Sequence, residues 1–407
     1  MDGALVAGHP GSLGGAAGTG GRHRLRALLG MAPVVLWPPS YEAARGWFRE
    51  ALPPALHAWQ GARLEARPLA ADASLTVDWA VAAPNRNPAR LLVLTTGLHG
   101  IEGVVGAYVL RLFVEEYLPR LDPATSGLLL VHALNPWGMH HRRKVNAGNV
   151  DLNRNFLLPA QPYDPDFNGD YKHLRGFLGP RRPLEAPPLS ATRFLFGLAQ
   201  AMSRNGAAVI QRAALLGQYG DPQGMYYGGA GLAEESRLLI ELLQLGVPAF
   251  ASATLVDVHS GFGPPRQLSL VHSTREPRPV DELRRSFGYP HVLKSDDRDF
   301  YAMRGDMIDS LYGRAGEAWP GTRFYASAFE FGTLGDSTVA LARSLRAMVH
   351  ENQAHHHGAR TGSAARWARQ EFEALYVPSD PAWWRAARES ARRAFDGILG
   401  AEGFLSP

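Results

Sequence analysis

The feature that most constrains the fold is an alternation of short β-type runs with segments of helical periodicity between about residues 40 and 348. Residues 91–96 and 128–134 are short continuous apolar runs that end at Gly and at Asn-Pro, which predicts strands. Residues 104–117 follow the first strand, and their apolar positions recur at helical spacing. Further strands are expected at 253–258, 267–271 and 323–331, and a further helix at 234–245. Strands separated by helices predict an α/β layer fold with a mostly parallel or mixed sheet.

The two ends of the chain differ from this central region. Residues 1–37 are rich in Gly and Ala and lack a periodic apolar pattern, which predicts a disordered leader, with Met31 as an alternative start. A basic stretch before an apolar run there resembles a signal peptide, but no small-x-small cleavage site follows it. Because no apolar segment approaches the roughly 20 residues of a transmembrane helix, we expect a cytoplasmic protein with no membrane partner. Residues 355–407 are expected to form a hydrophilic linker and a C-terminal helix at 381–399, which leaves a catalytic domain at 38–354.

Composition restricts the chemistry. The 407 residues include no cysteine, which excludes a disulfide framework, cysteine-ligated zinc, iron–sulfur clusters and a thiol nucleophile. A metal ion would therefore be held by His, Asp or Glu. The net charge is only +4 and the arginines are scattered, so no nucleic-acid partner is expected. The Pro- and Arg-rich stretch 175–188 is expected to be a loop that shapes the rim of a pocket.

Two predicted strands end in residues that can bind a metal ion. His99 and Glu102 follow strand 91–96 on a loop with three glycines, where an imidazole and a carboxylate can converge on one cation; a polar helix start is the alternative. His259 ends strand 253–258, where a lone His is otherwise a buried structural residue. Together the three complete a set of two histidines and one carboxylate. Such a set leaves a fourth position open for water, as in catalytic zinc sites.

Two acidic residues on the predicted strands are candidates to assist that site. Glu330 is a single carboxylate in the otherwise apolar strand 323–331, and a lone buried carboxylate is costly unless it is paired or functional. Near a metal-bound water it would be a general base. Asp257, two residues before His259, would lie on the same strand face and either orient a ligand or be a surface or capping residue.

A string of Arg and Asn residues lies between Glu102 and His259. It runs through Asn135–Gly138, Arg142–Asn146 and Val150–Phe156. One interpretation is a solvated basic loop. Rigid Arg donors mixed with Asn amides also suit the binding of a carboxylate and the polarisation of a carbonyl group.

In their order along the chain, these motifs resemble the M14 zinc carboxypeptidase superfamily. The closest resemblance is to its DUF2817 branch, which is related to the succinylglutamate desuccinylase and aspartoacylase group. The resemblance covers residues 91–332 and rests on His99-x-x-Glu102, Asn135-Pro-x-Gly138, Arg143, Asp151–Phe156, His259-Ser260 and Phe329-Glu330. It implies a three-layer α/β/α fold with a mixed sheet of roughly eight strands.

The resemblance also implies a role for each matching residue. One Zn²⁺ ion would be held by His99, Glu102 and His259, with Glu330 as base and proton shuttle. Arg143 would polarise the scissile carbonyl, and Asn153 and Arg154 would bind the free carboxylate of the substrate. Arg143 is preferred to Arg142 because the family pattern at this point is Arg-Lys.

A last match is the run Ile308-Asp309-Ser310-Leu311-Tyr312. It resembles the family's Ile-Asp-x-x-Tyr, which makes Tyr312 the residue that closes over the substrate. Tyr301 and Tyr325 are the competing candidates for that role.

The resemblance leads us to expect a zinc metallohydrolase of the metallocarboxypeptidase type. Such an enzyme would cleave an amide bond next to a free carboxylate in a small peptide, with a zinc-bound water activated by Glu330. The nearest rival is a deacylase of N-acyl amino acids, and a further alternative is a non-catalytic carboxylate-binding module. The 308–312 motif favours the peptidase, whereas the absence of a secretion signal favours a small cytosolic substrate.

Overall fold

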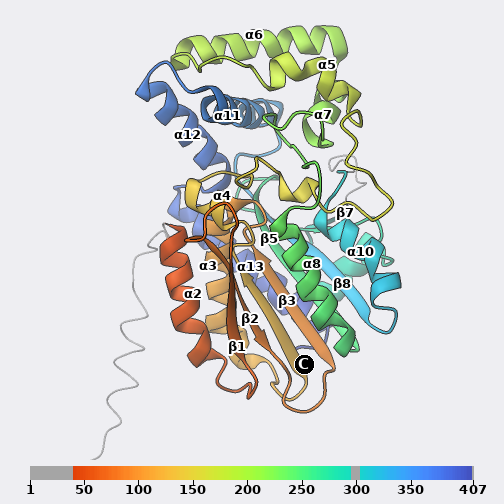
Figure 1. The fold of residues 1–407 in the computed structure, drawn as a ribbon. Coiled ribbons are helices and arrows are strands. Elements are labelled where there is room, and N and C mark those ends of the chain that lie inside the picture. The colour runs from red at the N-terminus through yellow and green to blue at the C-terminus, as the bar shows by residue number, and fades with distance from the viewer. Residues whose placement is uncertain (1–39, 295–302, 406–407) are drawn as a thin grey trace, which may run out of the picture. The chain divides into compact units, whose positions relative to one another are not determined.

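A mixed eight-stranded sheet is the centre of the fold (Figure 1). The structure is a computed structural model, which describes residues 40–294 and 303–405. The leader predicted at 1–37 and the competing Tyr301 lie outside these ranges. The strands are β1 (Arg63–Pro68), β2 (Thr76–Ala82), β3 (Arg90–Thr96), β4 (Ser126–His132), β5 (Ser252–Gly261), β6 (Leu268–His272), β7 (Val292–Lys294) and β8 (Arg323–Gly332).

The strand order is β1-β2-β4-β3-β5-β8-β6-β7. Strands β4, β3, β5 and β8 are mutually parallel, whereas β1, β2 and β6 introduce antiparallel pairs. The parallel strands are almost wholly buried, as is expected for strands covered on both faces. The predicted α/β/α fold with a mixed sheet is therefore confirmed.

Helices cover both faces of the sheet. On one face, Gly106 of α3 (Gly103–Glu116) lies against Thr96, and Phe395 of α13 (Pro381–Ala401) lies 5.1 Å from Phe329 between ring centres. On the other face, α8 (Glu234–Gly246) ends beside Leu91, and α10 (Met307–Ala318) lies along β8. The remaining helices of the sheet region are α2 (Tyr41–Ala55), α4 (Pro136–His141) and α9 (Val280–Phe287), with short 3-10 turns at Gly100–Glu102, Leu118–Arg120, Leu152–Arg154 and Val247–Ala249.

Five further helices form a group with its own hydrophobic core. They are α5 (Gly169–Leu178), α6 (Pro187–Asn205), α7 (Ala207–Leu215), α11 (Thr338–His357) and α12 (Gly362–Tyr376), and Figure 1 shows them together beyond one end of the sheet. Ile101, which lies between His99 and Glu102, is part of this second core. The loop that carries two of the predicted metal ligands is therefore supported by both cores.

Two expectations are wrong, and three strands were not expected. The predicted linker after residue 354 is wrong, because α11 continues to His357 and α12 follows, with Ala364, Ala368 and Phe372 buried at helical spacing. The stretch 175–188 is a loop only in its middle, since α5 covers its first residues and α6 begins at Pro187. Strands β1, β2 and β7 were not predicted.

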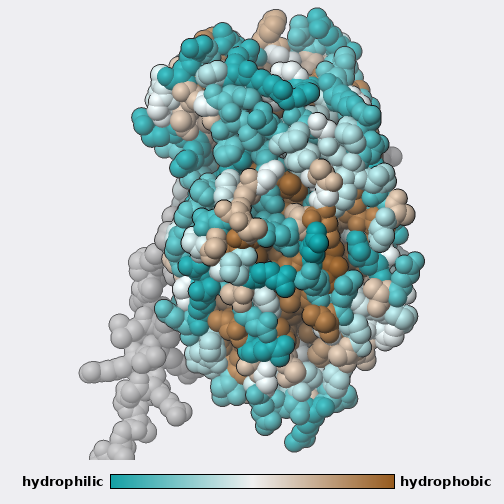
Figure 2. Space-filling model, viewed as in Figure 1, coloured by the Kyte–Doolittle hydropathy of each residue, from teal (hydrophilic) through white to brown (hydrophobic). Residues whose placement is uncertain are grey.

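Hydrophobic residues are visible around α8 in Figure 2. Large hydrophobic side chains are also exposed on α6, at Leu189, Leu195, Phe196 and Met202. Leu245, near the end of α8, is 83% exposed. None of the helices in the described ranges has both the length and the apolar character needed to cross a membrane.

Candidate active site

The predicted ligands and base meet at the carboxyl ends of three neighbouring strands. His99 and Glu102 follow β3, His259 is near the end of β5, and Glu330 is near the end of β8. These strands are parallel neighbours, and His259 pairs in register with Glu330. The carboxyl edge of a parallel sheet is where ligand sites of α/β proteins usually form.

The loop between His99 and Glu102 owes its shape to its glycines. Gly97 has a φ of +69°, a conformation that residues with a Cβ rarely adopt. A Cβ on Gly100 would lie only 2.2 Å from the carbonyl carbon of Gly138, so only glycine permits this approach of two backbones. The Gly100 and Ile101 N–H groups then donate to the carbonyls of Lys144 and Arg143.

His99, Glu102 and His259 form a compact buried cluster that could hold a metal ion. The Nδ1 atom of His99 lies 2.8 Å from Oε1 of Glu102, and Nδ1 of His259 lies 3.0 Å from Oε2. Both rings therefore present the same nitrogen to the same carboxylate. One atom from each of the three side chains lies within 4.8 Å of the other two, a separation that one ion can bridge.

An aspartate lies behind each histidine. Nε2 of His259 is 2.6 Å from Asp257, whose other oxygen accepts a hydrogen bond from Thr95 at 2.6 Å. Nε2 of His99 is 3.1 Å from Asp151. A carboxylate on the far nitrogen is the usual partner of a metal-ligating histidine, because it fixes the ring and makes the ligating nitrogen more basic.

Charge balance also fits a cation. The cluster and its immediate contacts hold four carboxylates (Glu102, Asp151, Asp257 and Glu330), but Lys144 is the only lysine or arginine of the described chain bonded to any of them. Burial opposes the charge of Glu102, yet the two histidines lower its pKa to about 2. Burial likewise opposes a proton on His259, but Asp257 and Glu102 raise its pKa well above its usual value. A divalent cation on His99, Glu102 and His259 would supply the positive charge that these carboxylates favour, and this donor set suits zinc.

Glu330 has the environment of a proton acceptor. One carboxylate oxygen accepts a hydrogen bond from the Phe262 N–H at 3.0 Å. Burial raises the pKa of Glu330, His259 lowers it and Glu102 raises it again, which leaves it at about 7. A carboxyl group with a pKa near neutrality can both take and return a proton.

Lys144 and Asp151 also contact the cluster, although the sequence predicted no role for either residue. The Lys144 ammonium lies 2.7 Å from Nε2 of His99 and 2.5 Å from Asp151. Asn146 turns the intervening chain, because its side chain accepts from the N–H groups of Gly148 and Val150. The contact of Lys144 with His99 and Asp151 could not be predicted from their spacing in the sequence, because it depends on the turn at Asn146.

Arg143 is buried, but its guanidinium is directed to α11. Its Nε and Nη2 donate to the two carboxylate oxygens of Glu351 at 2.7 and 3.2 Å, and Nη1 donates to Asn149. Arg142 ends α4 in a left-handed conformation with a φ of 57°. Arg143 is thus held beside Lys144 in this structure and is already paired with a carboxylate.

Asn153 and Arg154 are also held by protein groups. Asn153 donates to Asp306 and accepts from the N–H of Met307, at the start of α10. Arg154 donates to the carbonyls of Leu215 and of Asn153. Its guanidinium lies 5.2 Å from the ring centre of Tyr226, on whose ring the Lys144 ammonium also lies, at 5.3 Å.

The structure does not bring Tyr312 to the cluster. Its hydroxyl donates to Glu276 at 2.6 Å and accepts from the Ala326 N–H at 2.9 Å. Ala326 precedes Glu330 by four residues of strand, roughly 13 Å at about 3.3 Å per residue. The competing Tyr325 is buried and its hydroxyl lies 2.9 Å from Nε2 of His272.

The solved structures that match this chain include a fibrinolysis inhibitor, a carboxypeptidase and an amidase. Bovine thrombin-activatable fibrinolysis inhibitor is 12% identical, with 83% of this chain and 96% of that chain covered and a TM-score of 0.43. Carboxypeptidase A from Helicoverpa armigera is 13% identical, with 87% and 74% covered and a TM-score of 0.43. Murein-tripeptide amidase from Escherichia coli O157 is 18% identical, with 74% and 95% covered and a TM-score of 0.36.

The sequence was also compared with curated proteins and with protein families. Curated protein sequences give no match. Residues 37–389, which are most of the chain, match the family described as "Protein of unknown function (DUF2817)". The chain therefore belongs to the DUF2817 family.

Proposed function

We propose that the protein is a zinc-dependent hydrolase that cleaves an amide bond next to a free carboxylate, as a metallocarboxypeptidase does. The observation that carries the proposal is the cluster of His99, Glu102 and His259, in which an aspartate lies behind each histidine and Glu330 lies on the neighbouring strand. A purely structural metal site would need no proton acceptor such as Glu330 beside it.

His99, Glu102 and His259 would hold the zinc ion. When bound, zinc lowers the pKa of a coordinated water and polarises a substrate carbonyl. Glu330 would accept a proton from the attacking water and deliver it to the leaving amine, a role that suits its pKa of about 7. Asp151 and Asp257 would keep the two imidazole rings in place.

Basic residues beside the cluster would bind the carboxylate of the substrate. Lys144 and Arg154 both lie over the ring of Tyr226, and Arg143 lies next to Lys144 in the chain. Arg143 would exchange Glu351 for the substrate, since a guanidinium can bind either carboxylate or carbonyl oxygen. Asn153 and Arg154 would act in the same region, as the sequence resemblance implies.

Deacylation of N-acyl amino acids is the second candidate. The 308–312 motif favoured the peptidase, but Tyr312 is bonded to Glu276 and Ala326, away from Glu330. With that argument weakened, the remaining features suit either substrate, because both carry an amide bond and a free carboxylate.

The two activities can be separated by parallel assays on protein purified without chelator. We expect bound zinc by elemental analysis and cleavage of N-blocked dipeptides with a free C-terminal carboxylate, but not of their C-terminal carboxamides. Hydrolysis of N-acyl amino acids alone would assign the deacylase function. Zinc at no more than trace level together with no hydrolysis of either class would refute the enzyme and leave a carboxylate-binding module.

Asp257→Asn should weaken zinc binding without unfolding the site. The amide keeps the shape of the side chain but removes the charge that orients His259, which typically lowers metal affinity by about 10–100-fold. Competition with a chromogenic chelator would measure the affinity, with the exposed Asp336→Asn as the matched control. Unchanged affinity would show that Asp257 does not support a ligand.

A further inference from the structure

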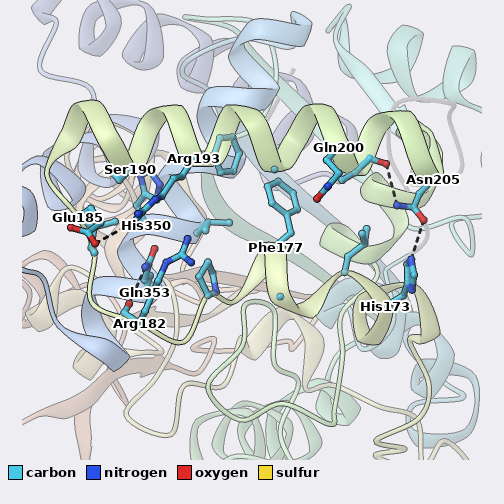
Figure 3. A pocket seen from close by; sticks show the side chains of 18 of the residues that line it. His173, Phe177, Arg182, Glu185, Ser190, Arg193, Gln200, Asn205, His350 and Gln353 are labelled. Atoms are coloured by element: carbon cyan, nitrogen blue, oxygen red, sulfur yellow. Dashed lines mark hydrogen bonds and ion pairs between the residues drawn. The ribbon is translucent and has the colours of Figure 1, made fainter.

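A separate cavity of about 360 Å³ lies among the helices beyond the sheet (Figure 3). Its walls come from α5, α6 and α11, together with the loop between α5 and α6. The volume falls in the range of small-molecule sites, roughly 300–1,000 Å³. This loop is the middle of the stretch 175–188, for which the sequence predicted a pocket rim.

The cavity is distinct from the candidate active site. Val349, His350 and Gln353 of α11 line it. Glu351 lies on the opposite side of the same helix, where it pairs with Arg143. The cavity and the candidate active site therefore lie on different sides of α11.

The middle of the cavity is apolar. Phe177 lies at its centre in Figure 3, between two polar ends. The other apolar side chains of the lining are Leu174, Pro180, Leu184, Phe194, Ala201 and Val349. An apolar ligand segment would be desolvated here by contact with aromatic and aliphatic groups.

One end of the cavity has an excess of positive charge. Arg193 and Arg360 both donate to the single carboxylate of Glu185, at 3.1 and 3.2 Å. Arg182 lies at the same end, and its guanidinium has no hydrogen bond or ion pair within the described part of the chain. The lining at this end thus holds two guanidinium groups, those of Arg182 and Arg193, and one carboxylate, that of Glu185. A ligand anion would find both charge and planar donors at this end.

Polar groups complete the lining, among them a further arginine, Arg204, next to Asn205 at the end of α6. His350 is only 3% exposed and lines the cavity, and its Nδ1 has no partner among the described residues. At the far end Gln200 lies near Asn205, whose side-chain oxygen is 3.1 Å from Nε2 of His173. Glu185 is the only acidic residue that the described part of the chain contributes to the lining.

We propose that this cavity binds a small amphiphilic anion, that is, an acidic head group on an apolar body. The head group, a carboxylate or a phosphate monoester, lies at Arg182 and Arg193. The apolar body lies along Phe177 and Phe194. No metal ion is needed to bind the head group, because the N–H groups of the two arginines donate hydrogen bonds to it directly.

Calorimetric titration of the full chain tests the proposal with octanoate and octyl phosphate as probes and octanamide as the neutral analogue. We expect saturable binding of one probe molecule per chain, at least about tenfold weaker for octanamide. The double variant Arg182→Met/Arg193→Met should weaken binding of the anion by at least about tenfold, because methionine keeps apolar bulk but no charge. Tighter binding of octanoate or of octyl phosphate identifies the preferred head group.

Two further variants make the result specific. Arg285→Met removes an exposed arginine of α9, outside the cavity, and should bind the probe as the unchanged protein does. Gln200→Trp, at an exposed position of the lining, should abolish binding by filling the far end, and it provides a second test if the double variant does not fold. Equal binding of octanamide, no binding of either anion, or binding that survives both cavity variants would overturn the proposal.

Discussion

Replacing Glu330 by Gln is expected to lower kcat for amide hydrolysis by roughly 10²–10⁴-fold. The amide is nearly the same size and can stay beside Phe262, but it cannot accept a proton from water or return one to the leaving amine. None of the contacts among His99, Glu102 and His259 involves the Glu330 side chain, so zinc content should not change. Steady-state kinetics and elemental analysis of the same preparation would measure both quantities.

The matched control is Glu50→Gln, which makes the same change at an exposed position of α2 and should leave kcat unaltered. Loss of zinc in Glu330→Gln would instead make Glu330 a metal ligand. Full activity with zinc retained would exclude Glu330 as the base and require another proton acceptor.

The sequence predicted best those parts of the fold that are buried on both sides. Strands β3 and β4 contain continuous apolar runs because helices cover both faces of the sheet, and such runs can be recognised from the sequence of one strand alone. Strand β1 was missed because it is an edge strand with mostly exposed, charged residues. The helix α12 was missed although Ala364, Ala368 and Phe372 recur at helical spacing, because its many charged residues suggested a linker.

The candidate site also has a part that the sequence predicted and a part that it did not. The grouping of His99, Glu102, His259 and Glu330 could be predicted, since each follows or ends a recognisable strand and parallel strands end at one edge. The orientation of Arg143 could not, because its partner Glu351 is 208 residues away on a helix with no motif. Tyr312 likewise bonds Glu276, which lies 36 residues earlier, outside the matching motif.

Trp384→Ala is expected to lower the free energy of unfolding by about 3–5 kcal/mol, as is usual when a buried Trp is removed from a core. Trp384 is 1% exposed and belongs to the main hydrophobic core. Its ring packs edge-on against Tyr108 at 5.0 Å between ring centres, and its indole N–H donates to the Pro378 carbonyl at 2.8 Å. The substitution would therefore leave a cavity and an unpaired carbonyl at once. Urea unfolding followed by circular dichroism would give the difference.

The matched control is Phe196→Ala on α6, where the ring is 71% exposed and its loss should cost little. Trp384→Phe should recover part of the loss, because a smaller ring refills some of the cavity. A large loss of stability would also bear on function. Phe395 of the same helix α13 packs on Phe329, the neighbour of Glu330, so this helix supports the strand that carries the candidate base. If Trp384→Ala lowered the free energy of unfolding no more than Phe196→Ala does, the packing of Trp384 would not stabilise the fold. The inference that α13 supports the strand of the candidate base would then be wrong.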